Sequence, residues 1–449
     1  MVVTPWGDSE SLRGRRLRPG PGKARAEVEQ NQRERLYGAT IALVAEKGYH
    51  ATTLADLCSL SGVSSRSFYD LFASKHELFL ETLKAVIELA IGYAVSTEAA
   101  IADSGGGEDG DWEAAARRGF DTFIEMVVAQ PATARVMLVE AYAAGPEAMA
   151  PIEAATAGFE WLTQQTAERS RERAGMPADL IAAHTGASRE IASARLRQGR
   201  ERELPHLLDE MWDFISSYRP PSEPLRSVGR APAPATESLE AHDHAERAIR
   251  AFAVVVAEKG YAAATVDEVV ARGAMSATTF YDNFAGKDDI LMAAIDSAAA
   301  QTIAAALPPF ERAADWPQGL RAAYGAVFNF LASRPALARL VLSEIYAAGP
   351  AAVERRVEAM RPFRALIKRG LERAPQTPRI APELIAGGIA TLCYRAIRDG
   401  GPESLPALAP LATYGTLAPF LGAEEACRVA NLTGRRERLL PHGASSLIL

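Results

Sequence analysis

The amino-acid sequence predicts an all-α protein built from two tandem copies of one helical unit. Three observations support this prediction. Apolar residues recur at spacings of three and four, as at Leu36, Ala39 and Leu43, which is the period of an amphipathic helix. No segment shows the alternation of apolar and polar residues that a strand requires. Finally, a long stretch of the first half of the chain reappears in the second half.

The internal repeat covers both ends of the unit. Residues 45–78 align without a gap to residues 257–290 at an offset of 212, with 14 of 34 positions identical. Residues 131–146 match residues 335–350 at an offset of 204, with 11 of 16 positions identical. Trp112 and Trp316 are also 204 positions apart. The whole unit is therefore duplicated, not a single motif.

A chain of 449 residues exceeds the usual size of one domain, so several domains are expected. The glycine- and acid-rich composition of 104–111 predicts a flexible surface loop. The segment lacks the ligand pattern of a calcium loop, so no metal is expected there. The predicted divisions are a basic, disordered arm at 1–28, a helix-turn-helix DNA-binding domain at 29–79, a helical regulatory domain at 80–217, a Pro- and Ser-rich linker at 218–239, a divergent helix-turn-helix DNA-binding domain at 240–291, a second helical regulatory domain at 292–430, and a C-terminal tail at 431–449.

Composition narrows the class of protein. Hydrophobic residues make up 48% and charged residues 23%, which is typical of a folded chain. No secretory signal and no run of eighteen apolar residues is present, so a cytoplasmic protein without membrane contact is expected. The cysteines Cys58, Cys393 and Cys427 lack zinc or redox spacing, and the histidines are scattered, so no metal or cofactor is predicted. The net charge of −7 neither supports nor excludes DNA binding, which depends on the local field.

The first repeat contains a predicted helix-turn-helix. Thr53 and Asp56 form a T-x-x-D capping box before a short apolar-periodic helix, and Gly62 supplies a tight turn. Ser64 is placed to cap a second short helix that runs through Phe72. The second repeat keeps the cap as Thr265 and Glu268.

The second short helix has an inner and an outer face. Phe68 and Phe72 are spaced i, i+4 and are expected to face the core, as are Phe280 and Phe284 in the second copy. The outward residues would meet the major groove of DNA. They are Ser65, Arg66, Ser67 and Tyr69.

The motif GVSSRSFYDLFASKHEL (62–78), preceded by Thr53 and the EKGY turn, resembles the DNA-binding headpiece of the tetracycline-repressor (TetR) family, and ARGAMSATTFYDNFAGKDDI (271–290) resembles a more divergent copy. The PxxAR…EAYAAGP blocks also resemble the start of the family's regulatory domain. The resemblance implies an all-helical bacterial transcriptional regulator. It implies phosphate contacts from Thr53, Tyr69 and Lys75 and approach to base edges by Ser65, Arg66 and Ser67. The full predicted DNA-binding set is Thr53, Ser64, Ser65, Arg66, Ser67, Tyr69 and Lys75 in the first copy and Thr265, Ser276, Ala277, Thr278, Thr279, Tyr281 and Lys287 in the second.

The two copies depart from the family pattern and from each other. Leu71 stands where the family often has His, and Asp70 and Asp282 place an acid near the expected phosphate path. Ala274 replaces the turn glycine Gly62. Residues 25–79 carry 6 basic and 7 acidic residues, a balance of −1, whereas residues 237–291 carry 5 and 10, a balance of −5. The second copy is therefore expected to bind DNA less tightly.

The leading functional interpretation is a DNA-binding regulator, a repressor by the family's habit, that a small apolar ligand releases from its operator. The two units would pair within one chain through the helices after residues 180 and 383, and unlike heads would read an asymmetric operator whose half-sites lie about 34–36 Å apart. In the alternative, only the first head binds DNA and two chains pair. A helical enzyme is a remote third interpretation, because no catalytic motif is present. The basic residues of 1–28 would either lie along DNA or form a solvated tail.

Overall fold

The computed structural model describes residues 2–17, 24–103, 112–231 and 243–432. The segment 104–111, for which a loop is predicted, lies outside these residues. We call residues 2–217 unit 1. Its elements are β1 (Val3–Thr4), β2 (Gly7–Asp8), η1 (Leu12–Arg15), α1 (Arg25–Lys47), α2 (Leu54–Ser61), α3 (Ser65–Leu71), α4 (Lys75–Asp103), α5 (Trp112–Ala129), α6 (Pro131–Arg135), the π-helical turn η2 (Val136–Glu140), α7 (Ala141–Ala144), α8 (Pro146–Arg169), α9 (Ala178–Arg197), η3 (Glu201–Glu203) and α10 (Leu204–Ser216).

The elements of unit 2, residues 243–432, repeat this order with α8 broken into shorter pieces, and the protein is all-α as predicted. They are α11 (His244–Lys259), α12 (Val266–Arg272), α13 (Ala277–Tyr281), α14 (Lys287–Glu311), α15 (Trp316–Ala332), α16 (Pro335–Leu342), η4 (Glu344–Tyr346), α17 (Pro350–Ala359), α18 (Arg361–Lys368), α19 (Gly370–Arg373), α20 (Ala381–Gly400), η5 (Pro402–Leu408), α21 (Ala409–Leu421) and α22 (Ala423–Ala430).

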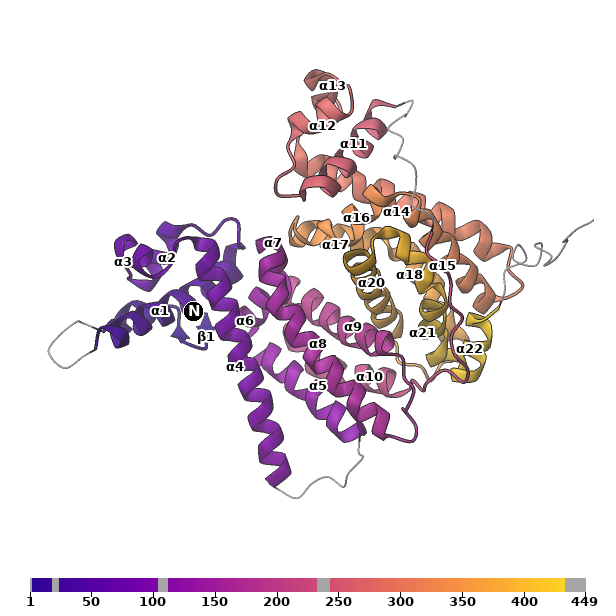
Figure 1. Cartoon of the computed structure of the whole chain (residues 1–449), viewed down its shortest axis with the longest axis horizontal. Coiled ribbons are helices and arrows are strands. Elements are labelled where there is room, and N and C mark those ends of the chain that lie inside the picture. The colour runs from indigo at the N-terminus through magenta and orange to yellow at the C-terminus, as the bar shows by residue number, and fades with distance from the viewer. Residues whose placement is uncertain (1, 18–23, 104–111, 232–242, 433–449) are drawn as a thin grey trace, which may run out of the picture.

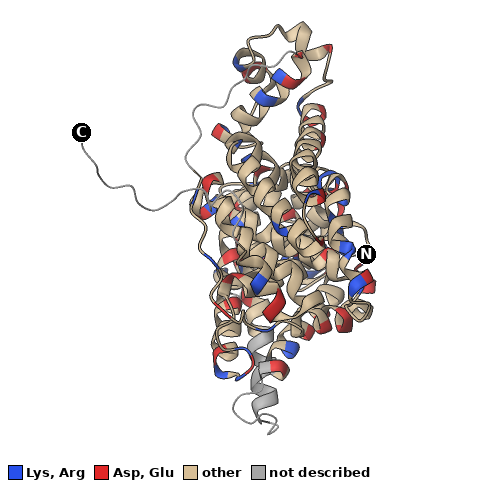
Figure 2. Cartoon of the chain, turned by 90° about the vertical axis from the view of Figure 1, so that its right-hand side faces the viewer, with Lys and Arg blue, Asp and Glu red and all other residues tan. Residues whose placement is uncertain are grey.

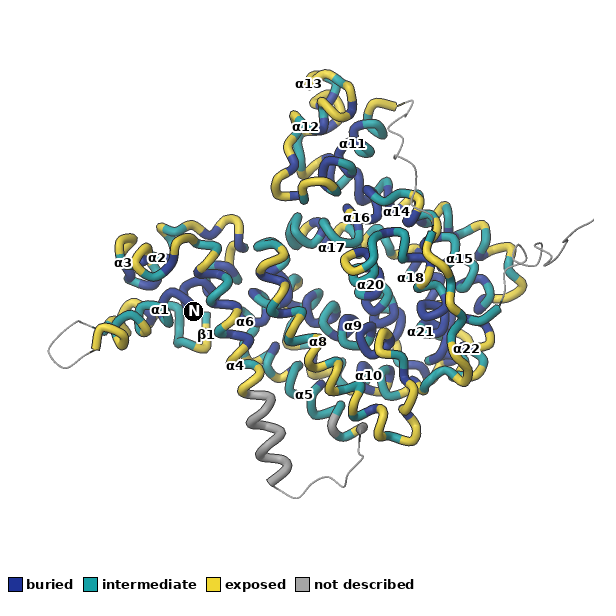
Figure 3. The backbone as a smooth tube through the Cα atoms, in the orientation of Figure 1, coloured by how far each residue is buried: buried dark blue, intermediate teal, exposed yellow. Residues whose placement is uncertain are grey.

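Each unit begins with a three-helix headpiece that projects from a larger helical body (Figure 1). Headpiece 1 comprises α1 to α3 and headpiece 2 comprises α11 to α13. In headpiece 1, Leu36 of α1 packs with Leu57 of α2 and with Phe68 and Phe72 around α3. Phe280 and Phe284 take the same places in headpiece 2. All four phenylalanines are buried, which confirms their predicted role as core residues. Figure 3 shows buried, intermediate and exposed stretches of backbone in both headpieces.

The predicted disorder of the arm 1–28 is wrong for residues 2–17. Val3–Thr4 pairs with Gly7–Asp8 in a tight hairpin, and the 3-10 turn η1 follows it. Leu12 is fully buried in the core of headpiece 1. Asn31 of α1 holds the end of this segment. Its side-chain N–H donates to the carbonyl of Arg15 at 3.1 Å, and its side-chain oxygen accepts from the N–H of Leu17 at 3.2 Å. Leu12 and Trp6, which packs on Tyr37, thus order a segment whose composition suggests a tail.

The linker also differs from the predicted flexible coil over the part that the structure describes, residues 218–231. Tyr218 is buried and its hydroxyl donates to the carbonyl of Gly415 at 2.5 Å. The N–H of Arg226 donates to the side chain of Asn431 at 2.7 Å, and the N–H of Ala231 donates to the carbonyl of Glu403 at 2.9 Å. The linker is therefore fastened along unit 2.

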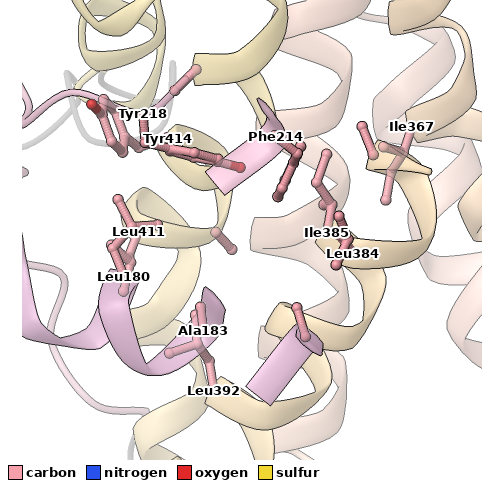
Figure 4. Packing of buried hydrophobic residues seen from close by; sticks show 14 of the residues in the cluster. Leu180, Ala183, Phe214, Tyr218, Ile367, Leu384, Ile385, Leu392, Leu411 and Tyr414 are labelled. Atoms are coloured by element: carbon pink, nitrogen blue, oxygen red, sulfur yellow. The ribbon is translucent and has the colours of Figure 1, made fainter. Parts of the chain in front are cut away.

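The two bodies share one hydrophobic core. Helix α9 of unit 1 packs along α20 of unit 2, and Figure 4 shows Leu180 and Ala183 of α9 facing Leu411 and Leu392 from unit 2. The helices approach closely, because a Cβ added at Gly388 would lie 3.0 Å from the carbonyl oxygen of Ala183. Small residues at this crossing allow the bodies to join.

Among the described residues, α14 is long and apolar enough to cross a membrane by length and composition, and a second span results if the bent pair 116–129 and 131–144 is counted as one. Nine side chains of α14 are buried inside the protein. The apolar composition of α14 is therefore accounted for by its place in the core of unit 2.

Candidate nucleic-acid interface and ligand cavities

The first helix of each helix-turn-helix begins at the predicted capping box. The hydroxyl of Thr53 accepts from the N–H of Asp56 at 3.2 Å, and the Asp56 carboxylate accepts from the N–H of Thr53 at 3.0 Å. Lys47 and Thr53 hold the pKa of Asp56 well below its usual range through hydrogen bonds. Thr265 and Glu268 form the same reciprocal pair in headpiece 2. Both predicted caps are confirmed.

The turn between the two helices requires a residue with a left-handed backbone conformation. Gly62 adopts φ 65° and ψ 26°, as its role in a tight turn predicts. The matching Ala274 adopts φ 47° and is the only non-glycine residue with positive φ in the described part of the chain. A Cβ in this region costs about 1–2 kcal/mol, so headpiece 2 keeps the geometry of the turn against local strain.

Helix α3 presents the predicted outer face to solvent. Ser64 caps it by accepting from the N–H of Ser67 at 3.1 Å, and Ser67 is half-buried by this contact. Ser65 and Arg66 are exposed, and Tyr69 is 60% exposed although it is aromatic. The helix ends at Leu71, one residue before the predicted limit. The exposed side chains form one continuous outer face.

Helix α13 repeats this arrangement with smaller groups. Ser276 caps it through the N–H of Thr279 at 3.0 Å. Ala277 and Thr278 are exposed, and Tyr281 is 58% exposed. Position 278 offers a hydroxyl and a methyl group where headpiece 1 offers the guanidinium of Arg66, so the two outer faces differ in charge.

The two lysines predicted to hold phosphates are bound within the headpieces. The Nζ of Lys75 donates to the carbonyls of Tyr49 and Thr52, both at 2.9 Å, and lies 4.5 Å from the centre of the Tyr49 ring. Burial lowers the pKa of Lys75. Lys287 donates to three carbonyls, at distances of 3.0 to 3.3 Å. Since an ammonium group has three donors, Lys75 retains one and Lys287 none.

Three cations of headpiece 2, Arg250, Lys259 and Arg272, form ion pairs with neighbouring acids. Arg272 forms a bidentate pair with Glu258 at 2.6 and 2.8 Å, and Lys259 pairs with Glu268. Figure 2 shows both signs of charge interspersed at the top of the view, where headpiece 2 lies. In headpiece 1, the exposed Arg66 forms no ion pair with any described residue, and η1 places the exposed Arg13 beside the turn at Gly62.

Sequence reasoning missed the residues that join each headpiece to its body. The buried carboxylate of Glu140 accepts from the N–H of Tyr49 at 3.1 Å, and the half-buried carboxylate of Glu344 accepts from the N–H of Tyr261 at 3.0 Å. Burial raises the pKa of Glu140. The two glutamates occupy the same position in the repeated 131–146 block and are identical in both copies. Their identity between the copies is the sequence signal that could have found them. Arg35 was also not predicted, and it joins two helices within headpiece 1, because it donates from α1 to the carbonyl of Ser61 at the end of α2 at 2.7 Å.

Two cavities lie within the joined bodies. The apolar cavity, of about 170 Å³, lies in unit 2 among α14 to α18 and α20, with a small part of its wall from α9. Tyr324, Phe328, Met360 and Phe363 line it. Cys393 also lines it, and burial raises the pKa of its thiol to about 12. The straddling cavity, of about 410 Å³, has walls from both units and many charged residues. In the described residues, no group of three or more potential metal ligands occurs.

Two exposed recognition helices on helix-turn-helix headpieces define a DNA-binding protein. Residues 36–82 and 249–294 both match the family model described as bacterial regulatory proteins, tetR family. The chain is therefore a DNA-binding transcriptional regulator that contains two tandem headpieces matching this family model.

Solved structures also resemble part of the chain. The fatty acid degradation regulator FadR from Bacillus halodurans is 18% identical, with a TM-score of 0.36, over 41% of this chain and 97% of that chain. The transcriptional regulator FadR from Bacillus subtilis, solved in complex with stearoyl-CoA, is 18% identical, with a TM-score of 0.34, over 39% of this chain and 97% of that chain. No curated protein matches the chain.

Proposed function

We propose that the chain is an internal pseudo-dimer that places two unlike heads on one asymmetric operator and leaves it when a small apolar ligand binds. The observation that carries this proposal is the packing of α9 on α20. Residues of α9 and α20 correspond at the offset of 204, as Leu180 does to Leu384 and Ile181 to Ile385. Equivalent helices of two copies thus form the interface, as in an isologous dimer.

Ion pairs across this contact support a fixed arrangement of the two bodies. Arg195 of α9 contacts Glu383 of α20 at 3.0 and 3.3 Å. Arg395 of α20 contacts Glu160 of α8 at 2.6 and 2.9 Å. These charged groups are partly buried, and bidentate geometry of this kind adds orientation as well as attraction. A fixed arrangement of the bodies is what a fixed half-site spacing requires.

For headpiece 1, we propose that Arg66 reads a base edge with Ser65 and Ser67 beside it, and that Tyr69, Thr53 and the remaining donor of Lys75 hold phosphates. An exposed Arg at the start of a recognition helix fits the bidentate pattern of guanine. Arg13 adds a cation beside the turn, in the segment that η1 orders. For headpiece 2, Thr278, Thr279 and Tyr281 take the corresponding places with fewer charges.

A second candidate function is favoured by the charges of headpiece 2. Its balance of −5, the three carbonyl contacts of Lys287 and the acid-paired Arg272 all weaken attraction to phosphates. In that case headpiece 1 alone binds DNA, and two chains pair on a symmetric site. Unit 2 then serves as a structural or sensing module.

We further propose the apolar cavity as the effector site. Its volume of about 170 Å³ is close to that of an apolar cavity of about 150 Å³ that holds benzene in another protein. Its wall includes α14, which follows directly on headpiece 2 in the chain. A ligand that changes the packing of α14 would therefore shift the position of that head.

A nuclease footprint on the DNA upstream of the protein's own gene, combined with the mass of the complex, tests the proposal. One chain of 48.1 kDa on two unlike half-sites about one helical turn apart supports the pseudo-dimer. Two chains on a symmetric site support the second candidate. A protein that binds no DNA fragment more tightly than random sequence contradicts both.

A further inference from the structure

The two cavities occupy equivalent places in the two units, yet their walls differ in chemistry. The offset of 204 relates the wall of the straddling cavity in unit 1 to the wall of the apolar cavity in unit 2. At three of these positions, a polar residue of the first is replaced by an apolar residue or by a thiol in the second. The pairs are Glu153 and Val357, Thr156 and Met360, and Arg189 and Cys393.

The charges of the straddling cavity are paired except at one position. Glu160 is held by Arg395. Glu190 lies 3.3 Å from Arg197, which also contacts Glu354 outside the wall. Arg398 contacts Glu153 at 2.8 Å and also Asp399 outside the wall. Each acid of the wall therefore has a basic partner.

Arg189 is the exception. Its guanidinium donates to the hydroxyl of Thr156 at 3.2 Å, and no carboxylate among the described residues forms an ion pair with it. It is half-buried in the cavity wall. A half-buried guanidinium in this setting matches one carboxylate of a ligand, because its fork of donors fits that group. The surrounding acids disfavour a ligand with several negative charges.

Three tyrosines give the same cavity an aromatic wall. Tyr142 of unit 1 stacks on Tyr346 of unit 2, with ring centres 4.8 Å apart and an interplanar angle of 26°. Tyr394 meets Tyr346 edge to face at 5.8 Å. The volume of about 410 Å³ lies within the range of pockets that hold small organic ligands.

We infer that the straddling cavity is a second ligand site, which takes a small organic carboxylate with a flat aromatic body. The carboxylate lies on Arg189 and the ring lies against the tyrosines. Because both units supply walls, the site exists only when the two bodies are joined, and this inference therefore rests on the proposed pairing of the units.

The stacked tyrosines lie close in sequence to the glutamates that contact the two heads. Tyr142 is two residues from Glu140, which holds headpiece 1 at Tyr49. Tyr346 is two residues from Glu344, which holds headpiece 2 at Tyr261. A ring bound against this stack acts on the two attachments at once, whereas the apolar cavity lies within unit 2.

Calorimetric titration of the full chain, free of DNA, with 2-naphthoate and with its neutral amide, 2-naphthamide, tests the inference. We expect the wild-type chain to bind 2-naphthoate at least tenfold more tightly than 2-naphthamide. Arg189→Gln should weaken binding of 2-naphthoate at least tenfold, and Arg189→Lys should retain part of it. The matched control is Arg202→Gln, which removes an exposed arginine that lines neither cavity and should leave binding unchanged.

Three results would overturn the inference: no heat of binding from 2-naphthoate, equal binding of acid and amide, or equal binding by wild type and Arg189→Gln. Equal thermal unfolding of the variants shows that the fold is retained, and Arg189→Lys serves if Arg189→Gln does not fold. The titration contains no DNA, so it tests the ligand site alone. The footprint tests the proposed function alone, so a negative result in one experiment is distinguishable from a negative result in the other.

Discussion

The carboxylate of Glu140 accepts a hydrogen bond from the backbone N–H of Tyr49 at 3.1 Å, across 91 positions of sequence. Glu344 does the same for Tyr261 across 83 positions. The first residue of each pair lies in the body and the second in the turn that follows the first helix of the headpiece. A carboxylate of each body therefore contacts its head, beside the apolar packing of α1 and α11 on the bodies. We propose that a shift in the body reaches the head at this hydrogen bond.

Replacing this carboxylate should loosen one head. Glu140→Ala leaves the N–H of Tyr49 without its acceptor, which costs about 1–3 kcal/mol for a buried group. Hydrogen exchange of peptides from 36–82 should become faster, while that of 249–294 stays unchanged. Glu344→Ala is the matched control and should give the reverse pattern. Equal effects on both heads would contradict this role.

Removing the exposed guanidinium of α3 should affect one half-site. We expect Arg66→Ala to cost about 1–3 kcal/mol in operator binding and to relax base preference at one half-site only, since Thr278 takes its place in headpiece 2. Selection of binding sites from random DNA measures this. The control is Thr278→Ala, which should change the other half-site. Equal loss at both half-sites would rule out the asymmetric arrangement.

Substitutions at the turn residues Gly62 and Ala274 should have opposite effects on the free energy of unfolding. Gly62→Ala places a Cβ at positive φ and 2.7 Å from Cγ of Arg13, so it should lower the free energy of unfolding by about 1–2 kcal/mol. Ala274→Gly relieves the strain at φ 47° and should stabilise headpiece 2 by up to about 1 kcal/mol, because added chain entropy offsets part of the gain. Urea denaturation measures both, and a destabilising Ala274→Gly would contradict the strain.

The contact of α9 with α20 should tolerate no added methyl group at Gly186 unless its neighbour is trimmed. A Cβ there would lie 2.1 Å from Oγ1 of Thr391. Gly186→Ala should destabilise the chain by about 1–3 kcal/mol through overpacking. Thr391→Gly in the same chain should restore part of this loss, because the Cβ of Thr391 would itself lie 2.6 Å from the added Cβ. Thermal unfolding of the single and double variants measures the coupling. Additive losses would show that the two residues do not share the contact.

His184 should make the stability of the joined bodies depend on pH. Its ring lies 4.3 Å from that of Tyr218, and burial, followed by the charge of Arg173, lowers its pKa to about 3. The unfolded chain, with a pKa of 6.5, binds more protons than the native chain between pH 6.5 and 3, so stability falls as pH decreases through this window.

Between pH 7 and pH 5 we expect this group to remove about 2 kcal/mol from the free energy of unfolding. His184→Phe should abolish that part of the pH dependence, because phenylalanine does not titrate. Its ring keeps the aromatic contacts of the histidine. His206→Gln is the control, since His206 is exposed and should leave the slope unchanged. Denaturant unfolding at each pH measures the slope, and an identical slope in His184→Phe would refute the assignment.

Local features of this protein follow from its sequence alone. The capping boxes at Thr53 and Thr265, the left-handed turn at Gly62 and the inward Phe68 are set by residues within four positions of each other. Their energies are local, so spacing and residue type suffice to predict them. The duplication was equally visible, because it is a comparison of the sequence with itself.

Other features were decided only by the tertiary structure, because they depend on residues that the fold brings together from distant parts of the chain. Burial of Leu12 orders an arm whose composition suggests disorder, and contacts with unit 2 fasten the linker. Carbonyl groups engage Lys75, which the resemblance assigns to phosphate. The attachments at Glu140 and Glu344, and the contrast between the two cavities, likewise arise from long-range packing, which local spacing does not encode.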